Sequence, residues 1–176
     1  LEDSGSNNTS SWATNISEGA SNESSQTLTF TVTNDNNPLF SSQPAISSSG
    51  TLSFTPASDV NGSATITVSL SDDGGGDDTY ADQTFTISVT EVNDAPSFTQ
   101  NSTITVLEDS GISTTANWAT SISTGPSDES SQTLTFSVTY NKGWLYSVPP
   151  TISSSGTLTF TPADDANGSS SVFVTL

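Results

Sequence analysis

The stretch Leu28-Thr29-Phe30-Thr31-Val32 alternates large apolar residues with threonine, and this alternation decides the fold. A period of two places the apolar groups on one face of an extended strand, as in an antiparallel strand that buries one face. The same alternation recurs in Leu52–Phe54, Ile66–Leu70 and Phe85–Val89. Gly and Asn-Gly punctuate these runs, and no segment shows a convincing helical period. The pattern therefore predicts an all-β protein built as an antiparallel β-sandwich.

The chain repeats itself at an offset of 106 residues. Trp12 recurs as Trp118, and Leu1–Leu70 aligns with Leu107–Leu176 without a gap, with 43 of the 70 aligned positions identical. The alternating runs recur in the second copy at Leu134–Val138, Leu158–Phe160 and Val172–Leu176. A period of this length corresponds to a whole domain. The sequence thus predicts two tandem domains of the same fold.

The segment Glu91-Val92-Asn93-Asp94-Ala95-Pro96-Ser97-Phe98 connects the two copies. Pro96 stiffens this connection and favours an extended backbone at the residue before it. We place the domains at residues 1–94 and 95–176, and we expect a strand at Ile104–Val106 early in the second one. The first domain lacks a counterpart of the first strand of its partner, and the second lacks a counterpart of the last. Such ends are expected of a piece of a longer tandem array.

Composition restricts the function. The chain has 19 acidic residues, one Lys, no Arg and no His, which gives a formal net charge of −18. Such a surface excludes nucleic acid and anionic membranes as partners, because both require Lys and Arg. The apolar runs are too short to cross a bilayer, so no membrane insertion is expected in this segment. The chain has no Cys, and an extracellular domain without disulfides commonly uses calcium for stability instead.

The linker Glu91–Phe98 resembles the cadherin inter-domain signature. The acidic-glycine run at 70–76, the Leu107-Glu108-Asp109 motif and the run Pro56–Gly62 extend this likeness, so that the whole unit resembles bacterial cadherin-like repeats of large secreted adhesins. The resemblance implies tandem Ig-like or cadherin-like sandwiches that bind Ca²⁺ and neighbouring repeats of the same chain. It also implies an extracellular, surface-attached bacterial protein of the kind involved in cell adhesion and biofilms. The linker is one residue shorter than in animal cadherins, which leaves the number of ions open.

The resemblance also implies a set of calcium ligands at the junction of the domains. Calcium takes six to eight oxygen ligands, mostly carboxylates and carbonyls from loops. The linker would supply Glu91, Asn93 and Asp94. The first domain would add Glu2, Asp59, Asp72 and Asp73, and the second Asp128 and Glu129. The alternative is that these are solvated surface acids. The stretch Asp72–Asp78 is interpreted as a loop that connects two strands.

Aromatic residues suggest a second kind of site. Trp12 and Trp118 occupy equivalent positions and are expected to pack in the two cores. The block Asn34–Phe40 changes in the second copy to Tyr140–Tyr146, which contains Trp144 and the only cation of the chain. Tyr140, Trp144 and Tyr146 are therefore candidates for contact with a glycan or a protein. The alternative is a diverged loop whose Leu145 and Tyr146 close the edge of the sandwich.

Catalysis has little support in this sequence. Without His or Cys there is no imidazole base, thiol nucleophile or ordinary zinc site, so we predict that the protein is not an enzyme. The favoured function is that of structural extender repeats, which project a binding domain of a calcium-dependent adhesin from the cell surface. Two alternatives are a subunit of an extracellular filament assembled by strand exchange and a carbohydrate-binding module. Self-association into fibres or surface glycans would be the partners in those cases.

Overall fold

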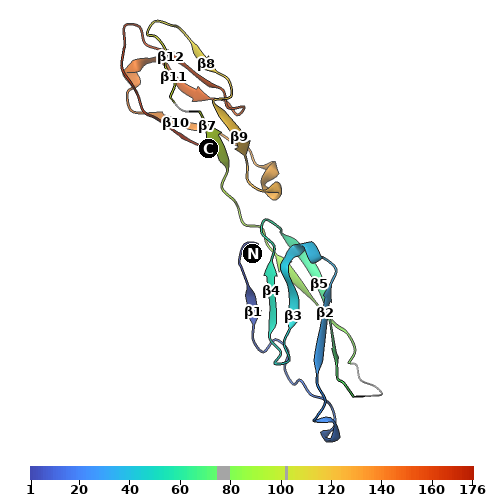
Figure 1. The fold of residues 1–176 in the computed structure, drawn as a ribbon. Helices are drawn as coiled ribbons and strands as arrows, with labels where there is room; N and C mark the ends of the chain where they lie inside the picture. The colour runs from blue at the N-terminus through green and yellow to red at the C-terminus, as the bar shows by residue number, and fades with distance from the viewer. Residues whose placement is uncertain (75–79, 102) are drawn as a thin grey trace. The chain divides into compact units, whose positions relative to one another are not determined.

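The computed structural model describes residues 1–74, 80–101 and 103–176, and the predicted all-β fold is confirmed (Figure 1). The chain divides into two compact units, Leu1–Val92 and Asn93–Leu176. The division falls two residues before the boundary placed from the sequence. Part of the predicted loop Asp72–Asp78 lies outside the described residues.

The first unit consists of two antiparallel sheets with the strand orders β1-β4-β3 and β2-β5-β6. Its strands are β1 (Asn7–Thr9), β2 (Thr29–Asn34), β3 (Phe40–Ile46), β4 (Leu52–Pro56), β5 (Gly62–Ser71) and β6 (Gln83–Val89). Two short 3₁₀ turns, η1 (Ser21–Glu23) and η2 (Asn37–Leu39), connect them. Figure 1 shows β1, β4 and β3 side by side in the first of these sheets.

The alternation read from the sequence sets which side chains are buried. In β5, Ala64, Ile66 and Val68 are buried, whereas the threonines between them are not. These three side chains join Leu39, Phe40, Ile46, Leu52, Ile87 and Val89 in one core between the sheets. This thin core is sufficient to hold the two sheets together, because each strand turns only its apolar face toward it.

The second unit repeats this arrangement at the same offset. Its strands are β7 (Ser97–Gln100), β8 (Ser113–Thr115), β9 (Ala119–Ser123), β10 (Ser137–Tyr140), β11 (Tyr146–Ile152), β12 (Leu158–Pro162) and β13 (Val172–Thr175). The turns η3 (Ser127–Ser131) and η4 (Gly143–Leu145) correspond to η1 and η2. The sheets are β11-β12-β8, β10-β13 and β7-β9. Trp118 is buried in this core and Trp12 packs against the other, as predicted.

Two strand expectations differ from the structure. The expected strand at Ile104–Val106 does not form, and β10 begins at Ser137 rather than at Leu134. A strand requires a ladder partner, and the pairings of the described residues include none for Thr103–Leu107. Ile104 nevertheless packs against the core, so its apolar character serves packing without pairing.

Each unit has a strand that the other lacks within this chain. β7 pairs with β9 in the second unit. β6 pairs with β5 in the first unit. The segment corresponding to β9, residues 13–17, forms no strand in the first unit. Pairing, rather than local sequence, therefore decides whether this segment is a strand.

Candidate metal centre

A buried glutamate lies where the first unit meets the connecting segment. The side chain of Glu2 is only 1% exposed. Its backbone N–H donates to the carbonyl of Thr90 at 3.0 Å, which pairs the start of the chain with the end of the unit. The backbone N–H of Val92 donates to Oε1 of Glu2 at 2.6 Å. Oε2 is also buried, yet it makes no hydrogen bond among the described residues.

The second unit holds a similar glutamate against the same segment. Glu129, in η3, is 5% exposed, and its Oε1 accepts a hydrogen bond from the backbone N–H of Asp94 at 2.9 Å. Gln132 donates from Nε2 to Oδ1 of Asn93 at 3.0 Å and holds the preceding linker residue. In the described part of the chain, Oε2 of Glu129 is buried without a hydrogen-bond partner, as Oε2 of Glu2 is.

The repeat offers an internal comparison for both residues. Glu108 is the counterpart of Glu2, and it is exposed. Glu23 is the counterpart of Glu129, and it is half-buried, with Oε2 accepting from the N–H of Ala20 at 2.9 Å. The residue type is the same within each pair, so the difference in burial comes from the surrounding segments of the chain. Of these four glutamates, Glu2 and Glu129 accept a backbone N–H from the segment that connects the units.

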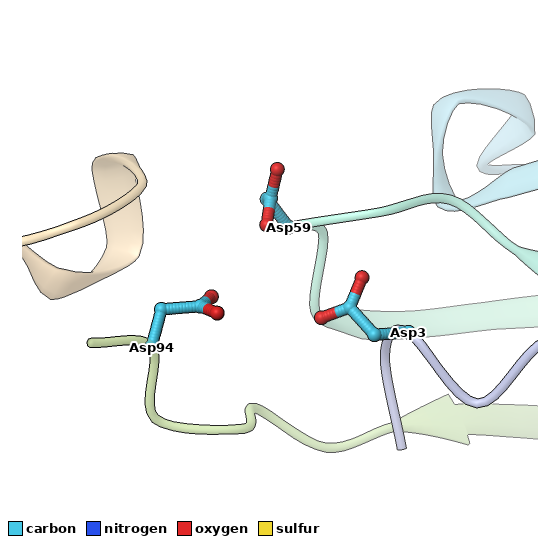
Figure 2. Close-up of side chains that lie close together, drawn as sticks. All are labelled: Asp3, Asp59 and Asp94. Carbon is cyan, nitrogen blue, oxygen red and sulfur yellow. The ribbon is translucent and has the colours of Figure 1, made fainter.

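Two aspartates of the first unit, one of which directly follows Glu2 in the sequence, lie close together. Figure 2 shows Asp3 and Asp59 on neighbouring loops at one end of the first unit, and their carboxylates approach within 4.8 Å of one another. Both have a left-handed backbone, with φ of 57°, which aspartate tolerates better than most residues. Asp94, also drawn in Figure 2, belongs to the second unit, where its backbone binds Glu129.

The same pair of loops meets in the second unit. Oδ1 of Asp109 accepts the backbone N–H of Asp165 at 3.0 Å, and these residues are the counterparts of Asp3 and Asp59. The approach of the two aspartate loops is therefore a property of the repeat. Sequence reasoning selected Asp59 and missed Asp3, although Asp3 directly follows Glu2 in the motif that recurs as Leu107-Glu108-Asp109.

Electrostatics make these buried carboxylates costly without a cation. Removing an ionised carboxylate from water costs several kcal/mol, whereas one charge-assisted hydrogen bond returns about 1.5–3 kcal/mol. The only Lys or Arg of the chain is Lys142, and Oε2 of neither glutamate has a hydrogen-bond partner among the described residues. The available donors are carboxylate and amide oxygens, which is the donor set of Ca²⁺ and Mg²⁺. The residues therefore fit a hard divalent cation.

The remaining predicted ligands are Glu91, Asp128, Asp72 and Asp73, and the last two lie at the other end of the first unit from Glu2. Glu91 is exposed in the connecting segment, next to Val92, and Asp128 is half-buried beside Glu129 in η3. Asp72 and Asp73, however, follow the last residue of β5, whereas Asp59 precedes its first residue. Ten residues of strand separate these ends, a length of about 30 Å. The structure does not bring Asp72 and Asp73 together with Glu2 and Asp59.

Asp73 instead fixes a turn at its own end of the unit. Its Oδ1 accepts the backbone N–H of Thr27 at 2.7 Å, just before β2 begins. This hydrogen bond is the main reason why the pKa of Asp73 lies below its ordinary value of 3.8. Asp72 has a comparable local role, because its Oδ1 accepts the N–H of Gly74 at 2.8 Å.

We predict that Asp73 contributes to acid stability. Its lowered pKa means that the folded state favours the carboxylate, so the stabilisation is complete above about pH 3.8 and is lost as the pH falls through the lowered value. An Asp73→Asn variant should lose this part of the pH dependence. Urea unfolding between pH 2 and pH 6 measures it, and an identical pH profile for the variant and the wild type would contradict the prediction.

The three candidate contact aromatics do not form one exposed surface. The ring of Tyr146 packs edge-on against Tyr140 and Phe160, with centroid separations of 5.4 and 5.8 Å. Both tyrosines are half-buried, whereas Trp144 is 62% exposed. Leu145 is buried. The alternative interpretation, in which this block closes the edge of the sandwich, accounts for Tyr140, Leu145 and Tyr146.

Comparison of the sequence with protein-family models and with curated proteins finds no match. Within the described ranges, none of the helical segments has the length and apolarity that crossing a membrane requires.

Proposed function

We propose that this chain consists of calcium-stabilised structural repeats of an extracellular bacterial adhesin, which extend from the cell surface and hold a binding domain away from it. The observation that carries the proposal is the pair of buried glutamates, each with one carboxylate oxygen left without a hydrogen bond among the described residues. A bound cation is the natural partner for such an oxygen in a chain with a single Lys. The bacterial, surface-attached setting rests on the resemblance of the linker and loops to cadherin-like repeats.

The proposed ligands differ between the units. In the first unit Glu2 would bind the ion together with Asp3 and Asp59 from the two neighbouring loops. In the second unit Glu129 would bind it with Asp128, and Asn93 and Asp94 would add oxygens from the connecting segment. We favour calcium over magnesium because these ligands come from flexible loops, and Mg²⁺ demands near-ideal octahedral geometry.

The binding of the connecting segment gives these sites a mechanical role. Glu2 holds the N–H of Val92 and Glu129 holds the N–H of Asp94, two residues further along. Cations that fix both carboxylates would therefore restrict the backbone between the two units. A restricted connection converts a flexible string of domains into a spacer. High negative charge keeps such a spacer soluble and prevents neighbouring chains from collapsing together.

Thermal unfolding in the presence of calcium tests the proposal. Extracellular modules bind calcium with dissociation constants of about 10⁻⁴–10⁻³ M, so 10 mM calcium, which is about ten- to a hundredfold above such constants, adds about 1.4–2.7 kcal/mol per site. For units of this size we expect melting temperatures to rise by roughly 5–20 °C. The measurement is calorimetry in 10 mM CaCl₂, in 10 mM MgCl₂ and in EDTA. Equal melting temperatures in calcium and EDTA would rule the proposal out, and an equal rise in magnesium would remove its calcium specificity.

A further inference from the structure

The block in which the two copies lose their identity carries an exposed apolar patch in the second unit. Trp144 of η4 is 62% exposed and Val148 of β11 is 52% exposed, and the neighbouring Pro149 is exposed as well. We call these three residues the Trp144 patch. The first unit has smaller or more polar residues at the equivalent positions, namely Pro38, Ser42 and Gln43. Packing of the tyrosines of this block closes the edge of the sandwich, but it does not account for the patch.

The loop that carries the patch has the same backbone hydrogen bonds in both units. The N–H of Leu145 donates to the carbonyl three residues before it at 3.2 Å, and the carbonyl of Leu145 accepts the N–H of Ala163 at 2.9 Å. Leu39 makes the equivalent bonds in the first unit, at 3.2 and 3.0 Å. The ring of Trp144 reaches Gly168, where a Cβ would lie 3.7 Å from Cη2. The indole is therefore held by a defined loop, which limits the entropy lost when it binds a ligand.

The exposure of the patch is a property of its position in the repeat. Pro38, the counterpart of Trp144, is exposed in the first unit, where β6 and the connecting segment are both present. The strands that flank the patch, β10 and β11, correspond to β2 and β3 of the first unit. There β2 and β6 form opposite edges of one sheet, so β6 does not cover this position. The indole of Trp144 therefore lies where the fold itself leaves the surface open.

The charge of the loop changes together with its apolar character. The first unit has Asp35 and Asn36 before the turn, with a combined charge of −1, whereas the second has Asn141 and Lys142, with a combined charge of +1. The exchange of Asp35 for Asn141 removes a strongly hydrated carboxylate from the turn. The chain as a whole has a net charge of −18 and repels polyanions and further copies of itself at long range. An uncharged ligand is therefore favoured.

The size and chemistry of the patch favour a glycan over a protein. A protein interface buries about 800 Å² on each partner, whereas an aromatic side chain contributes about 150–250 Å², and the patch has one such side chain. Pro149 has no backbone N–H, which makes this part of β11 unsuitable for the addition of a strand. The residues on either side of Gly168, Asn167 and Ser169, are exposed and polar. A flat apolar ring bordered by small polar residues suits a sugar, whose C–H groups stack on the indole while its hydroxyl groups form hydrogen bonds.

We propose that the Trp144 patch binds a neutral glycan of glucose-type pyranose rings, with one ring stacked on the indole of Trp144. A ring whose hydroxyl groups are all equatorial presents a flat face of C–H groups, which fits an indole better than a face with an axial hydroxyl. Val148 and Pro149 extend the apolar contact to the adjoining part of the glycan. This site uses none of the carboxylates assigned to the cation, so it can fail while the proposed function stands.

The test titrates the whole chain with cellohexaose, a neutral glucose oligosaccharide, and follows the indole N–H signals of the three tryptophans by NMR. We expect a saturable shift of the Trp144 signal with a dissociation constant of about 1 mM, which corresponds to weak specific binding. Trp12 and Trp118 belong to the two cores, and their signals are internal controls that should not move. No shift of the Trp144 signal at about 10 mM cellohexaose would overturn the proposal. Tighter binding of hexagalacturonate, an acidic oligosaccharide of the same length, would overturn it as well.

Substitutions taken from the first unit locate the binding. Trp144→Pro introduces the residue found at the equivalent position 38 and should weaken cellohexaose binding by about tenfold or more. Phe173→Ser removes an equally exposed aromatic residue outside the patch and should leave the dissociation constant within about twofold. If Trp144→Pro disturbs the loop, the double variant Val148→Ser, Pro149→Gln retains the indole and should weaken binding by about threefold.

Unchanged affinity of a folded Trp144→Pro chain, or of the double variant, would overturn the proposal. Sedimentation velocity tests the other occupant, a second copy of the chain. Self-association that requires Trp144 and that cellohexaose does not reverse would assign the patch to that second copy and would also overturn the proposal.

Discussion

Glu2→Gln should remove the calcium-dependent stabilisation of the first unit while leaving its calcium-free stability nearly unchanged. The amide keeps the acceptor for the N–H of Val92 but loses the charge that holds a cation. We expect the gain of about 1.4–2.7 kcal/mol in 10 mM calcium to disappear. In EDTA the change should be within about 1 kcal/mol, because relief of the buried charge opposes the new unsatisfied N–H groups. Urea unfolding in calcium and in EDTA measures both values.

Glu108→Gln is the matched control for this variant. It makes the same chemical change at the equivalent position of the repeat, where the side chain is exposed. We expect an effect within about 0.5 kcal/mol under both conditions, as for most surface substitutions. Glu129→Gln and Glu23→Gln form a second matched pair in the other half of the repeat. Equal calcium responses of Glu2→Gln and Glu108→Gln would show that burial beside the linker has no part in metal binding.

Gly156→Ala should destabilise the second unit by about 3–5 kcal/mol. Gly156 has a left-handed backbone with φ of 79°, which costs a residue with a Cβ about 1–2 kcal/mol. A Cβ at this position would in addition overlap the carbonyl oxygen of Ala119. That backbone cannot move away easily, because the N–H of Ala119 donates to the carbonyl of Gly156 at 3.0 Å. Urea unfolding followed by the amide signals of the second unit measures the loss.

Gly111→Ala separates the two contributions. Gly111 has a similar φ of 71°, but a Cβ there would meet nothing within 4 Å. We expect a cost of only about 1–2 kcal/mol, from the backbone conformation alone. If both substitutions cost the same, the close approach of Ala119 would have no energetic consequence and the account of this turn would be wrong.

The fold was predictable because its signal is local and repeated. The alternation in Ile66–Leu70 and Phe85–Val89 determines which residues of β5 and β6 face the core, and the structure follows it. The expected strand at Ile104–Val106 fails for a reason that alternation cannot reveal. Alternation with a period of two shows which face of a segment is apolar. Strand formation also requires a neighbouring strand with which the segment can pair. Residues 13–17 and β9 occupy equivalent positions in the two copies, but the first segment forms no strand whereas β9 does.

The candidate metal centre was predictable only in part. Resemblance selected Glu2 and Glu129 as ligands near the linker, and the structure places both against the connecting segment, but nothing in the sequence distinguishes Glu2 from the identical Glu108. Glu2 and Glu129 are buried where they accept hydrogen bonds from Val92 and Asp94, which lie 90 and 35 residues away in the sequence. Asp72 and Asp73 were grouped with the site by the same resemblance. The length of β5 separates them from it, and that separation requires the register of the sheet.

A crystal structure of the chain grown in calcium tests the central claim most directly. We predict anomalous density for calcium at 2.3–2.6 Å from Oε2 of Glu2 and from Oε2 of Glu129. Neither oxygen has a hydrogen bond among the described residues, so each is available as a ligand. Density for water alone at both oxygens, from crystals that contain calcium well above millimolar concentration, would contradict the account.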